Sequence, residues 1–559
     1  MKKHLLKFMS VMLTLVITAL TVIVPVSAAT CDCTNEPIIY LYGKHELYLC
    51  DDNGNYILDE NGNKILNTAN NFDYGEMTKT LLPLFAKGYF SKDWSEFSEA
   101  LQGYFLPLYE GRGCDGNGDV IDYVHYRNDD KNYVGGSGGA THGYDLGYKA
   151  YFNFDYRESP ILVAKKFDEF VSQVKAYTGH DKVSVITRCQ GTNILMAWLQ
   201  LYESGEESVW VDEKDMPAVP YESVDHIALL NGCMEGIDSV EELFSGRLDA
   251  DEDALYRYLG TIDLKSVLGE ETGEFVATFI DSLKETYGIV LTADVLKGIY
   301  AQFAPDTIPP ILRAFYATCG GISALVKDHF DEYIDFVFPT DEIKEEYAGL
   351  IEKETYINKN VTTRTAELLS AAAEHGVKVG VYGEYGFQSP PDCPESAYVG
   401  DTLVSLSNQT IGATTAKVDG KLSQKYIDAQ VEKGLGKYIS ADGQVDTSTC
   451  LFPETTWCFK NMEHEWPNQL HELVLRFIRE DITVDDTGAF MNYVRIDIEN
   501  GVLSPLQEVN ENDVKWGTLS DVEQGKATTT ILNKIIDFFR ALLEKLSEII
   551  TEIINTAKA

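Results

Sequence analysis

The sequence predicts an α/β protein with a doubly wound, mostly parallel sheet, a large helical cap insertion and an amphipathic helix at the C-terminus. Between residues 150 and 230, short apolar runs alternate with helical patterns, which is typical of parallel βαβ units. Residues 235–374 carry helical patterns and no convincing strand, which indicates an insertion rather than a simple crossover. The alternating pattern then resumes at Val377.

The N-terminus has the features of an export signal. Lys2 and Lys3 precede an apolar run over residues 11–26, and the small residues at 27–29 suit a signal peptidase site. We therefore expect residues 1–28 to be a signal peptide and the mature protein to be secreted. No other stretch is long and apolar enough to span a bilayer. The formal net charge of −42 disfavours nucleic acid and anionic membranes as partners.

The first part of the predicted core covers residues 29–234. Residues 37–43 are a short apolar run that ends in glycine, as expected for a buried parallel strand, and Lys44 lies in the loop that follows. Two Asn-Gly pairs within residues 53–66 predict a small hairpin insertion. Calcium binding there, or at 115–119, is the less favoured alternative, because the acidic residues lack the glycine and glutamate positions of an EF-hand loop.

The most informative segment is 183–198, an apolar strand that runs into a sharp turn and then a helix, with Cys189 at the apex. Such an elbow exposes the apex side chain and directs the first helical N–H groups toward it, where they can hold an oxyanion. We expect the backbone N–H groups of Gln190 and of the loop at Lys44 to be these donors. Gly191, two residues after the apex, lets helix and strand pack closely. The alternative is a buried structural cysteine.

A nucleophilic thiol needs a base, and the base needs a carboxylate that orients it. The second part of the predicted core, residues 375–484, offers both in the order that follows an elbow nucleophile. Asp401 comes after the resumed strand, and His464 comes just before the final helix. Taken singly, Asp401 is compatible with an ordinary turn aspartate and His464 with a surface histidine. The rival candidates for the acid and base roles are Asp59, Glu384 and His375, of which Glu384 directly follows a strand.

The remaining segments are predicted to lie outside the core. Residues 235–374 should form a helical cap above the strand ends, interrupted by Pro305, Pro309 and Pro310. Residues 485–527 do not continue the alternation and are predicted to be an accessory segment. Residues 528–559 place apolar side chains at heptad-like spacing. Because such a stripe is unfavourable in water, we expect this helix to dock on the parent domain or to self-associate; its polar face is too acidic for an anionic membrane.

A resemblance to a known family becomes specific at three places. Residues 152–160 read Phe-Asn-Phe-Asp-Tyr-Arg-Glu-Ser-Pro, which is similar to the Tyr-Asp-Trp-Arg segment before the elbow in lecithin:cholesterol acyltransferase-like lipases. Residues 400–404 resemble the acid loop of that family, and His464 falls where its histidine would. The resemblance implies an α/β-hydrolase fold and acyl-ester chemistry, often on lipid-like substrates. Cys189 replaces the usual serine, and dienelactone hydrolases use cysteine, histidine and aspartate on this fold.

The function expected from these features is that of an exported esterase or lipase-like acyl hydrolase that works through an acyl-thioenzyme. The expected catalytic residues are Cys189, Asp401 and His464, with no cofactor and no metal. One alternative is a binding protein that keeps the hydrolase scaffold without efficient chemistry, and another is an acyltransferase. The chain has ten cysteines, and a disulfide between Cys450 and Cys458 is an open option.

Overall fold

The computed structural model describes most of the chain between residues 35 and 506. The described ranges are 35–42, 48–49, 51, 55–59, 61–64, 74–109, 113–121, 126–127, 133–135, 149–203, 221–261, 288–314, 316–464, 470–487, 493–496 and 503–506. The predicted signal peptide, the loop at Lys44 and the predicted C-terminal helix therefore lie outside the described residues.

A nine-stranded sheet forms the centre of the molecule, in the order β13-β12-β11-β8-β7-β6-β1-β5-β4. All neighbouring pairs are parallel except the outermost two, β12 with β13 and β4 with β5. This confirms the predicted α/β class with a mostly parallel sheet. The strands are β1 (Ile38–Tyr42), β4 (Tyr133–Gly135), β5 (Lys149–Phe152), β6 (Val183–Arg188), β7 (Val224–Leu230), β8 (Lys378–Tyr385), β11 (Thr456–Lys460), β12 (Tyr493–Ile496) and β13 (Leu503–Pro505).

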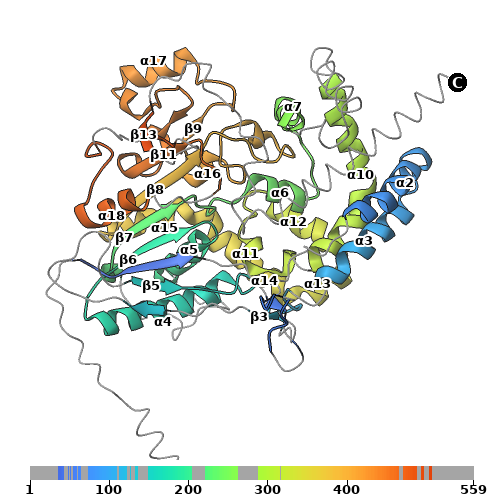
Figure 1. Ribbon diagram of the computed structural model, residues 1–559, viewed down its shortest axis with the longest axis horizontal. Coiled ribbons are helices and arrows are strands. Elements are labelled where there is room, and N and C mark those ends of the chain that lie inside the picture. Colours follow the sequence, from blue (N-terminus) through green and yellow to red (C-terminus); the bar gives the residue numbers. More distant parts are fainter. Residues whose placement is uncertain are drawn as a thin grey trace, which may run out of the picture.

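Helices pack on both faces of this sheet, because alternate side chains of the buried strands point to opposite sides. Ile39 and Leu41 of β1 belong to one apolar cluster, and Ile38 and Tyr40 belong to another. The first cluster contains α4 (Pro160–Thr178), α5 (Gly191–Glu203) and α15 (Thr365–Glu374), and the second contains α18 (His471–Glu480). Figure 1 shows α4 and α5 together, with α18 beyond the other face of the sheet.

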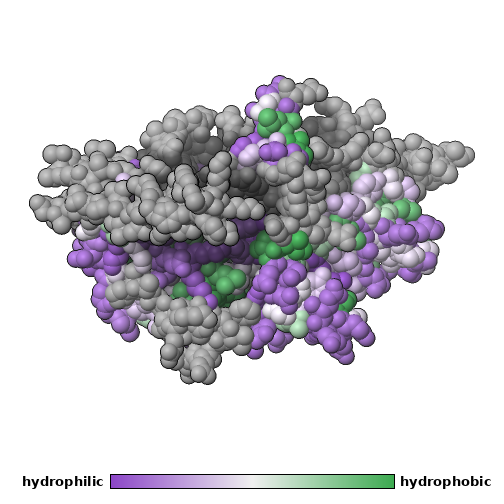
Figure 2. All heavy atoms as spheres, turned by 90° about the horizontal axis from the view of Figure 1, so that it is seen from below, coloured by the Kyte–Doolittle hydropathy of each residue, from purple (hydrophilic) through white to green (hydrophobic). Residues whose placement is uncertain are grey.

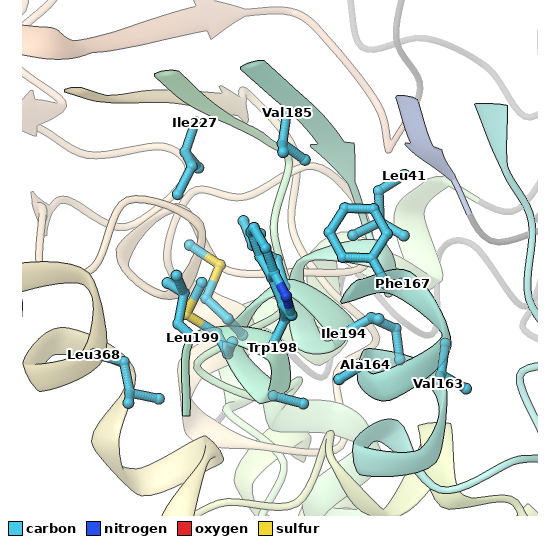
Figure 3. Packing of buried hydrophobic residues seen from close by; sticks show 14 of the residues in the cluster. Leu41, Val163, Ala164, Phe167, Val185, Ile194, Trp198, Leu199, Ile227 and Leu368 are labelled. Carbon is cyan, nitrogen blue, oxygen red and sulfur yellow. The ribbon is translucent and has the colours of Figure 1, made fainter. Parts of the chain in front are cut away.

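Trp198 of α5 is the centre of the first cluster. Figure 3 shows its indole between side chains of α4, such as Phe167, and side chains of the strands, such as Val185. The ring is fully buried, and its Nε1 donates to Asp168 Oδ1 at 2.9 Å, so its polar edge is satisfied inside the core. The contacts of Trp198 fix α5, and therefore the turn before it, against the sheet.

The described residues between 235 and 374 contain helices and no strand. These helices are α6 (Asp238–Phe244), α7 (Glu252–Thr261), α10 (Gly288–Ala314), α11 (Gly320–Ser323), α12 (Phe330–Val337), α13 (Asp341–Glu346), α14 (Ala348–Asn360) and α15. The last of them, α15, packs on the sheet as the helix before β8, with Leu368 and Leu369 in the first cluster. The segment 235–374 thus includes a helix that packs on the sheet.

Two helices from the N-terminal part of the chain, within the residues 29–234 that are predicted to belong to the core, pack against α10. They are α2 (Tyr74–Ser91) and α3 (Ser95–Tyr109), and Figure 1 shows them beside α10. Trp94 and Phe97 each place a ring 5.3 Å from the ring of Phe303 on α10. This aromatic contact joins segments that are about two hundred residues apart in sequence. Further along the chain lie the short helices α16 (Leu406–Gln409) and α17 (Gln424–Glu432).

The predicted interruptions at Pro305, Pro309 and Pro310 are wrong, because α10 runs through all three residues. A proline inside a helix lacks the N–H that would bond the carbonyl four residues earlier. For Pro310 that carbonyl is on Asp306, and the side chain of Gln102 on α3 donates to it at 2.9 Å. A neighbouring helix thus replaces one lost hydrogen bond, which no local pattern could indicate.

The sheet also extends past residue 484, where we expected only an accessory segment. The strand β12 pairs in parallel with β11, and β13 pairs antiparallel with β12. Val494 of β12 is buried in the second cluster. A four-residue strand shows too little periodicity to be recognised in sequence, and its pairing partner decides its structure.

Among the described residues on the face in Figure 2, most are hydrophilic, and the hydrophobic ones lie in a few separate groups. At the predicted hairpin insertion, Leu58 and Lys64 form an antiparallel bridge. None of the described helices combines the length and the apolar character needed to span a membrane.

The contact between α5 and β1 at Gly191 gives a test of this architecture. A Cβ at this position would lie 2.3 Å from the carbonyl oxygen of Leu41 and 2.7 Å from Thr187 Oγ1. We expect Gly191→Ala to lower the free energy of unfolding by about 1–3 kcal/mol or more. The matched control is Gly103→Ala on α3, where a Cβ meets nothing within 4 Å and should stabilise the helix by up to about 1 kcal/mol. Urea unfolding of both variants measures the difference; equal effects would contradict the described packing.

Candidate active site

Cys189 occupies a strained turn between β6 and α5. Its φ angle is 50°, in the left-handed region that non-glycine residues rarely adopt. The turn is held at both ends, since the N–H of Cys189 donates to Leu230 O at 3.2 Å and its carbonyl accepts the Thr192 hydroxyl at 2.6 Å. The side chain is partly exposed, whereas the other described cysteines are buried. The conformation and exposure are those expected for an elbow nucleophile.

Gln190 lies directly after the apex, at the N-terminal end of α5, where backbone N–H groups have no carbonyl within the helix to bond. Anions bind favourably at such helix ends. The second predicted donor, Lys44, lies outside the described residues, so the structure describes only one side of the predicted oxyanion site.

Asp401 lies in a tight loop after β8 and is completely buried. One carboxylate oxygen, Oδ1, accepts the backbone N–H groups of Leu403 at 3.0 Å and Val404 at 2.7 Å. The other, Oδ2, accepts from His464 Nδ1 at 2.7 Å. The loop therefore fixes the carboxylate, and the carboxylate fixes the imidazole. This short bond joins residues that lie on separate loops after β8 and β11.

His464 is buried between this carboxylate and the thiol of Cys189. Burial alone would lower the pKa of the imidazole, but the charge of Asp401, the charge of Cys189 and side-chain interactions with both residues raise that pKa well above its ordinary value. Among the described residues, His464 Nε2 has no partner that meets standard hydrogen-bond geometry. The effect of Cys189 on the pKa indicates that the thiol lies beside the ring without an aligned hydrogen bond, and such bonds are often long or poorly aligned in unliganded sites.

Arg188 holds the histidine loop against the elbow. This residue is the last of β6, immediately before Cys189, and its guanidinium donates to the carbonyl oxygen of His464 at 3.1 Å. The contact ties the backbone of the base to the backbone of the turn. It was not predicted from the sequence, since the two residues are distant in the chain and no spacing rule relates them.

Glu384, the rival acid, lies next to the same group but does not bond the histidine. Its Oε2 accepts from Asn231 Nδ2 at 3.0 Å, and burial followed by the charge of Asp401 raises its pKa well above the ordinary value. Burial and the neighbouring carboxylate thus favour the protonated form of Glu384, as expected when two acids share a buried site.

Glu384, Asp401 and His464 are the one described group that could hold a metal ion, with ligand atoms within 4.8 Å of one another. The group fits a metal poorly. His464 Nδ1 is already bonded to Asp401 Oδ2, so a metal at this place would have to displace that hydrogen bond. A hydrogen-bonded carboxyl–imidazole system accounts for the arrangement better.

The two other rivals lie elsewhere. Asp59 is exposed, and its carboxylate accepts the backbone N–H groups of Asn61 and Asn63 within its own turn, both at 2.8 Å. His375 precedes β8, at the opposite end of the parallel strands from Cys189, and its ring stacks on Tyr221 with centroids 4.6 Å apart. Neither contributes to the group around Cys189.

The segment that carries the family resemblance turns the chain from β5 into α4. Arg157 and Asp155 form a close ion pair at 2.6 Å, with the guanidinium largely buried. The carbonyl of Tyr156 accepts from Gly321 N at 3.1 Å, and a side chain at Gly321 would collide with Gln190. The segment thus supports α11 and, through it, the side of the elbow at Gln190.

The described cysteines are all thiols. They are Cys114, Cys189, Cys233, Cys319, Cys393, Cys450 and Cys458. The optional bridge between Cys450 and Cys458 is therefore not formed, although both residues belong to one apolar cluster.

Comparison of the sequence with protein-family models and with curated proteins finds no match.

The bond between Asp401 and His464 predicts how the base responds to each neighbouring acid. Asp401→Asn should lower the pKa of His464, because it removes the charge that most favours the imidazolium while burial remains. Glu384→Gln, which replaces a neutral group of the same size, should leave that pKa raised. An NMR titration of the imidazole Cε1 signal measures both. A larger fall in Glu384→Gln than in Asp401→Asn would exchange the roles of the two acids.

The buried carboxyl of Glu384 also predicts a pH dependence of stability. The folded protein keeps the proton to higher pH than the unfolded chain, so the contribution of Glu384 is fully favourable below its unfolded pKa and is lost as pH rises toward the folded value. Glu384→Gln cannot lose a proton, so its stability relative to the wild type should increase from pH 5 to pH 8. Urea unfolding of both proteins at pH 5 and at pH 8 measures the two free energies of unfolding. A difference between the proteins that does not change with pH would show that Glu384 is not protonated in the fold.

Proposed function

We propose that the protein is an exported acyl hydrolase of the esterase or lipase type, with Cys189 as nucleophile, His464 as base and Asp401 as the acid that orients the base. The observation that carries the proposal is the 2.7 Å bond from His464 Nδ1 to Asp401, on a ring whose other nitrogen is buried near the thiol. A thiol next to an imidazole that is in turn bonded to a carboxylate is the arrangement of a catalytic triad.

The positions of the three residues in the sheet support this assignment. Cys189 follows β6, Asp401 follows β8 and His464 follows β11, so all three come after the C-terminal ends of parallel strands. This is the end at which open α/β sheets bind ligands, and the chain order nucleophile, acid, histidine is that of the α/β-hydrolase fold. The resemblance to lecithin:cholesterol acyltransferase-like lipases points to the same fold.

The reaction begins with proton transfer from the Cys189 thiol to His464 Nε2. The sulfur attacks the ester carbonyl carbon, and the N–H of Gln190, with a second donor near Lys44, stabilises the oxyanion. The intermediate collapses, and the alcohol leaves with the proton from His464. Water, deprotonated by His464, then attacks the acyl-thioenzyme, which releases the carboxylic acid and restores the thiol.

Asp401 contributes by orientation and charge. Its bond to Nδ1 selects the tautomer in which Nε2 can accept the thiol proton, and its negative charge stabilises the imidazolium that forms. A thiolate is a strong nucleophile and also a good leaving group, so the site suits activated esters and thioesters better than amides. An alcohol in place of water would give acyl transfer by the same steps.

The test uses nitrophenyl esters of short acids, and the wild type should hydrolyse them and lose activity with iodoacetamide. Cys189→Ala should lower kcat/KM by at least about 10³-fold, because the covalent route is removed. Cys450→Ala, which removes a buried thiol of another cluster, is the matched control and should retain activity. Unchanged turnover in Cys189→Ala would remove the assignment, and absence of turnover in the wild type would favour a non-enzymatic binding protein on the same scaffold.

A further inference from the structure

A second thiol, Cys233, lies against the elbow of Cys189. The parallel strands β6 and β7 pair Arg188 with Leu230, so the segments that follow these two strands leave the sheet side by side. Cys233 comes just after β7 and is buried, at 1 % exposure. The proposed acyl chemistry makes no use of it.

One hydroxyl joins the backbones of the two cysteines. Thr192 Oγ1 accepts the N–H of Cys233 at 3.1 Å and donates to the carbonyl oxygen of Cys189 at 2.6 Å. The backbone nitrogen of Cys233 and the carbonyl oxygen of Cys189 therefore both bond to one oxygen atom, Thr192 Oγ1. A disulfide requires Cα atoms about 4.4–6.8 Å apart, so closing one here needs the two backbone segments to stay as near to each other as the shared hydroxyl of Thr192 holds them.

The side chain of Cys233 is also fixed in place. Its thiol donates to Asn193 Oδ1 at 3.1 Å, and Asn193 Nδ2 donates to the carbonyl oxygen of Cys233 at 3.2 Å. Cys233 belongs to an apolar cluster with Leu325 and Val404, and the side chain of Cys189 packs against this same cluster. Interaction with the side chain of Cys189, followed by burial, raises the pKa of the Cys233 thiol, which indicates that the two side chains lie next to each other.

We propose that Cys189 and Cys233 form a hydroperoxide-sensitive pair, in which Cys189 is oxidised first and Cys233 then closes a disulfide that blocks the nucleophile. The inference depends on the two thiols and on His464, and it does not require that the protein hydrolyse esters.

The first step is oxidation of Cys189. Its thiolate attacks one oxygen of the hydroperoxide, the O–O bond breaks, and the leaving oxygen takes the proton that His464 had accepted from the thiol. The sulfur is oxidised to sulfenic acid, and the peroxide is reduced to water or an alcohol. In the second step the sulfur of Cys233 attacks the sulfenic sulfur, the S–O bond breaks, and water leaves with the proton of Cys233. Two thiols and one hydroperoxide thus give one disulfide, one alcohol or water, and one further water.

The environments explain why Cys189 reacts first. It is the partly exposed described cysteine and has an imidazole beside it, and exposed thiolates next to a base are the ones that oxidise. Burial raises the pKa of the other thiols, for example of Cys114 and of Cys450 to about 12. Conversion of Cys189 to neutral sulfenic acid removes one of the causes that raise the pKa of Cys233, which favours attack by the second thiol.

The experiment treats the full-length protein with several equivalents of H2O2, unfolds it, blocks the remaining thiols with iodoacetamide and maps peptides without reduction; a sulfinic acid consumes two equivalents of peroxide, and the buried Cys233 is alkylated only in the unfolded chain. We expect a peptide pair linked through Cys189 and Cys233, loss of alkylation at both residues, and recovery of both on addition of dithiothreitol. Cys233→Ala should give no linked pair and should convert Cys189 to sulfinic acid, which dithiothreitol does not reverse. Cys233→Ser, which can keep the hydrogen bond to Asn193, should behave in the same way and covers the case in which the alanine variant fails to fold.

The matched control is Cys450→Ala, which should form the linked pair as the wild type does. The proposal is overturned if the wild type yields sulfinic acid at Cys189 with no linked peptide, or if Cys233→Ser recovers with dithiothreitol as fully as the wild type. Because peptide mapping needs no substrate, a protein that forms the pair but hydrolyses no ester would keep this proposal and reject only the acyl hydrolase.

Discussion

The hydrogen bond between His464 and Asp401 is the interaction on which the site depends. It links two loops that follow different strands, and it does so inside the protein, where an unpaired charge would be costly. The backbone N–H groups of the loop after β8 hold the carboxylate before it meets the ring. The imidazole is in turn held near Cys189 by the contact of Arg188 with the histidine backbone. Without the bond between His464 and Asp401, these contacts would not orient the imidazole.

Much of this arrangement is predictable because parallel strands impose it. The apolar run that ends at Cys189 predicts the elbow, and the C-terminal ends of parallel strands must meet at one edge of the sheet. The choice between Asp401 and Glu384 is not predictable, since both follow or end the same strand. Tertiary contacts decide which acid bonds the histidine. Asn231 donates a hydrogen bond to the carboxyl group of Glu384, whereas a tight loop places Asp401 against the imidazole ring. Cys233 was missed for a similar reason, although its place just after the neighbouring strand was a usable signal.

Contacts between distant segments account for the other differences from the sequence analysis. The helix α10 continues through its prolines because Gln102 satisfies a carbonyl that Pro310 leaves without a donor. The helices α2 and α3 pack on α10 through the ring contacts of Trp94 and Phe97 with Phe303. The strand β12 is too short to recognise until β11 provides its partner. In each case, local sequence preference is weaker than a packing partner that only the folded chain supplies.

The central claim is that His464 activates the thiol of Cys189, and the rate at which iodoacetamide alkylates Cys189 at pH 6 tests it most directly. Only the thiolate reacts, so this rate reports how well the imidazole removes the proton. We expect His464→Gln to slow alkylation of Cys189 by at least about tenfold, the equivalent of about 1.4 kcal/mol. Equal rates in the wild type and in His464→Gln would mean that the two side chains do not act together, and the site would then have no base.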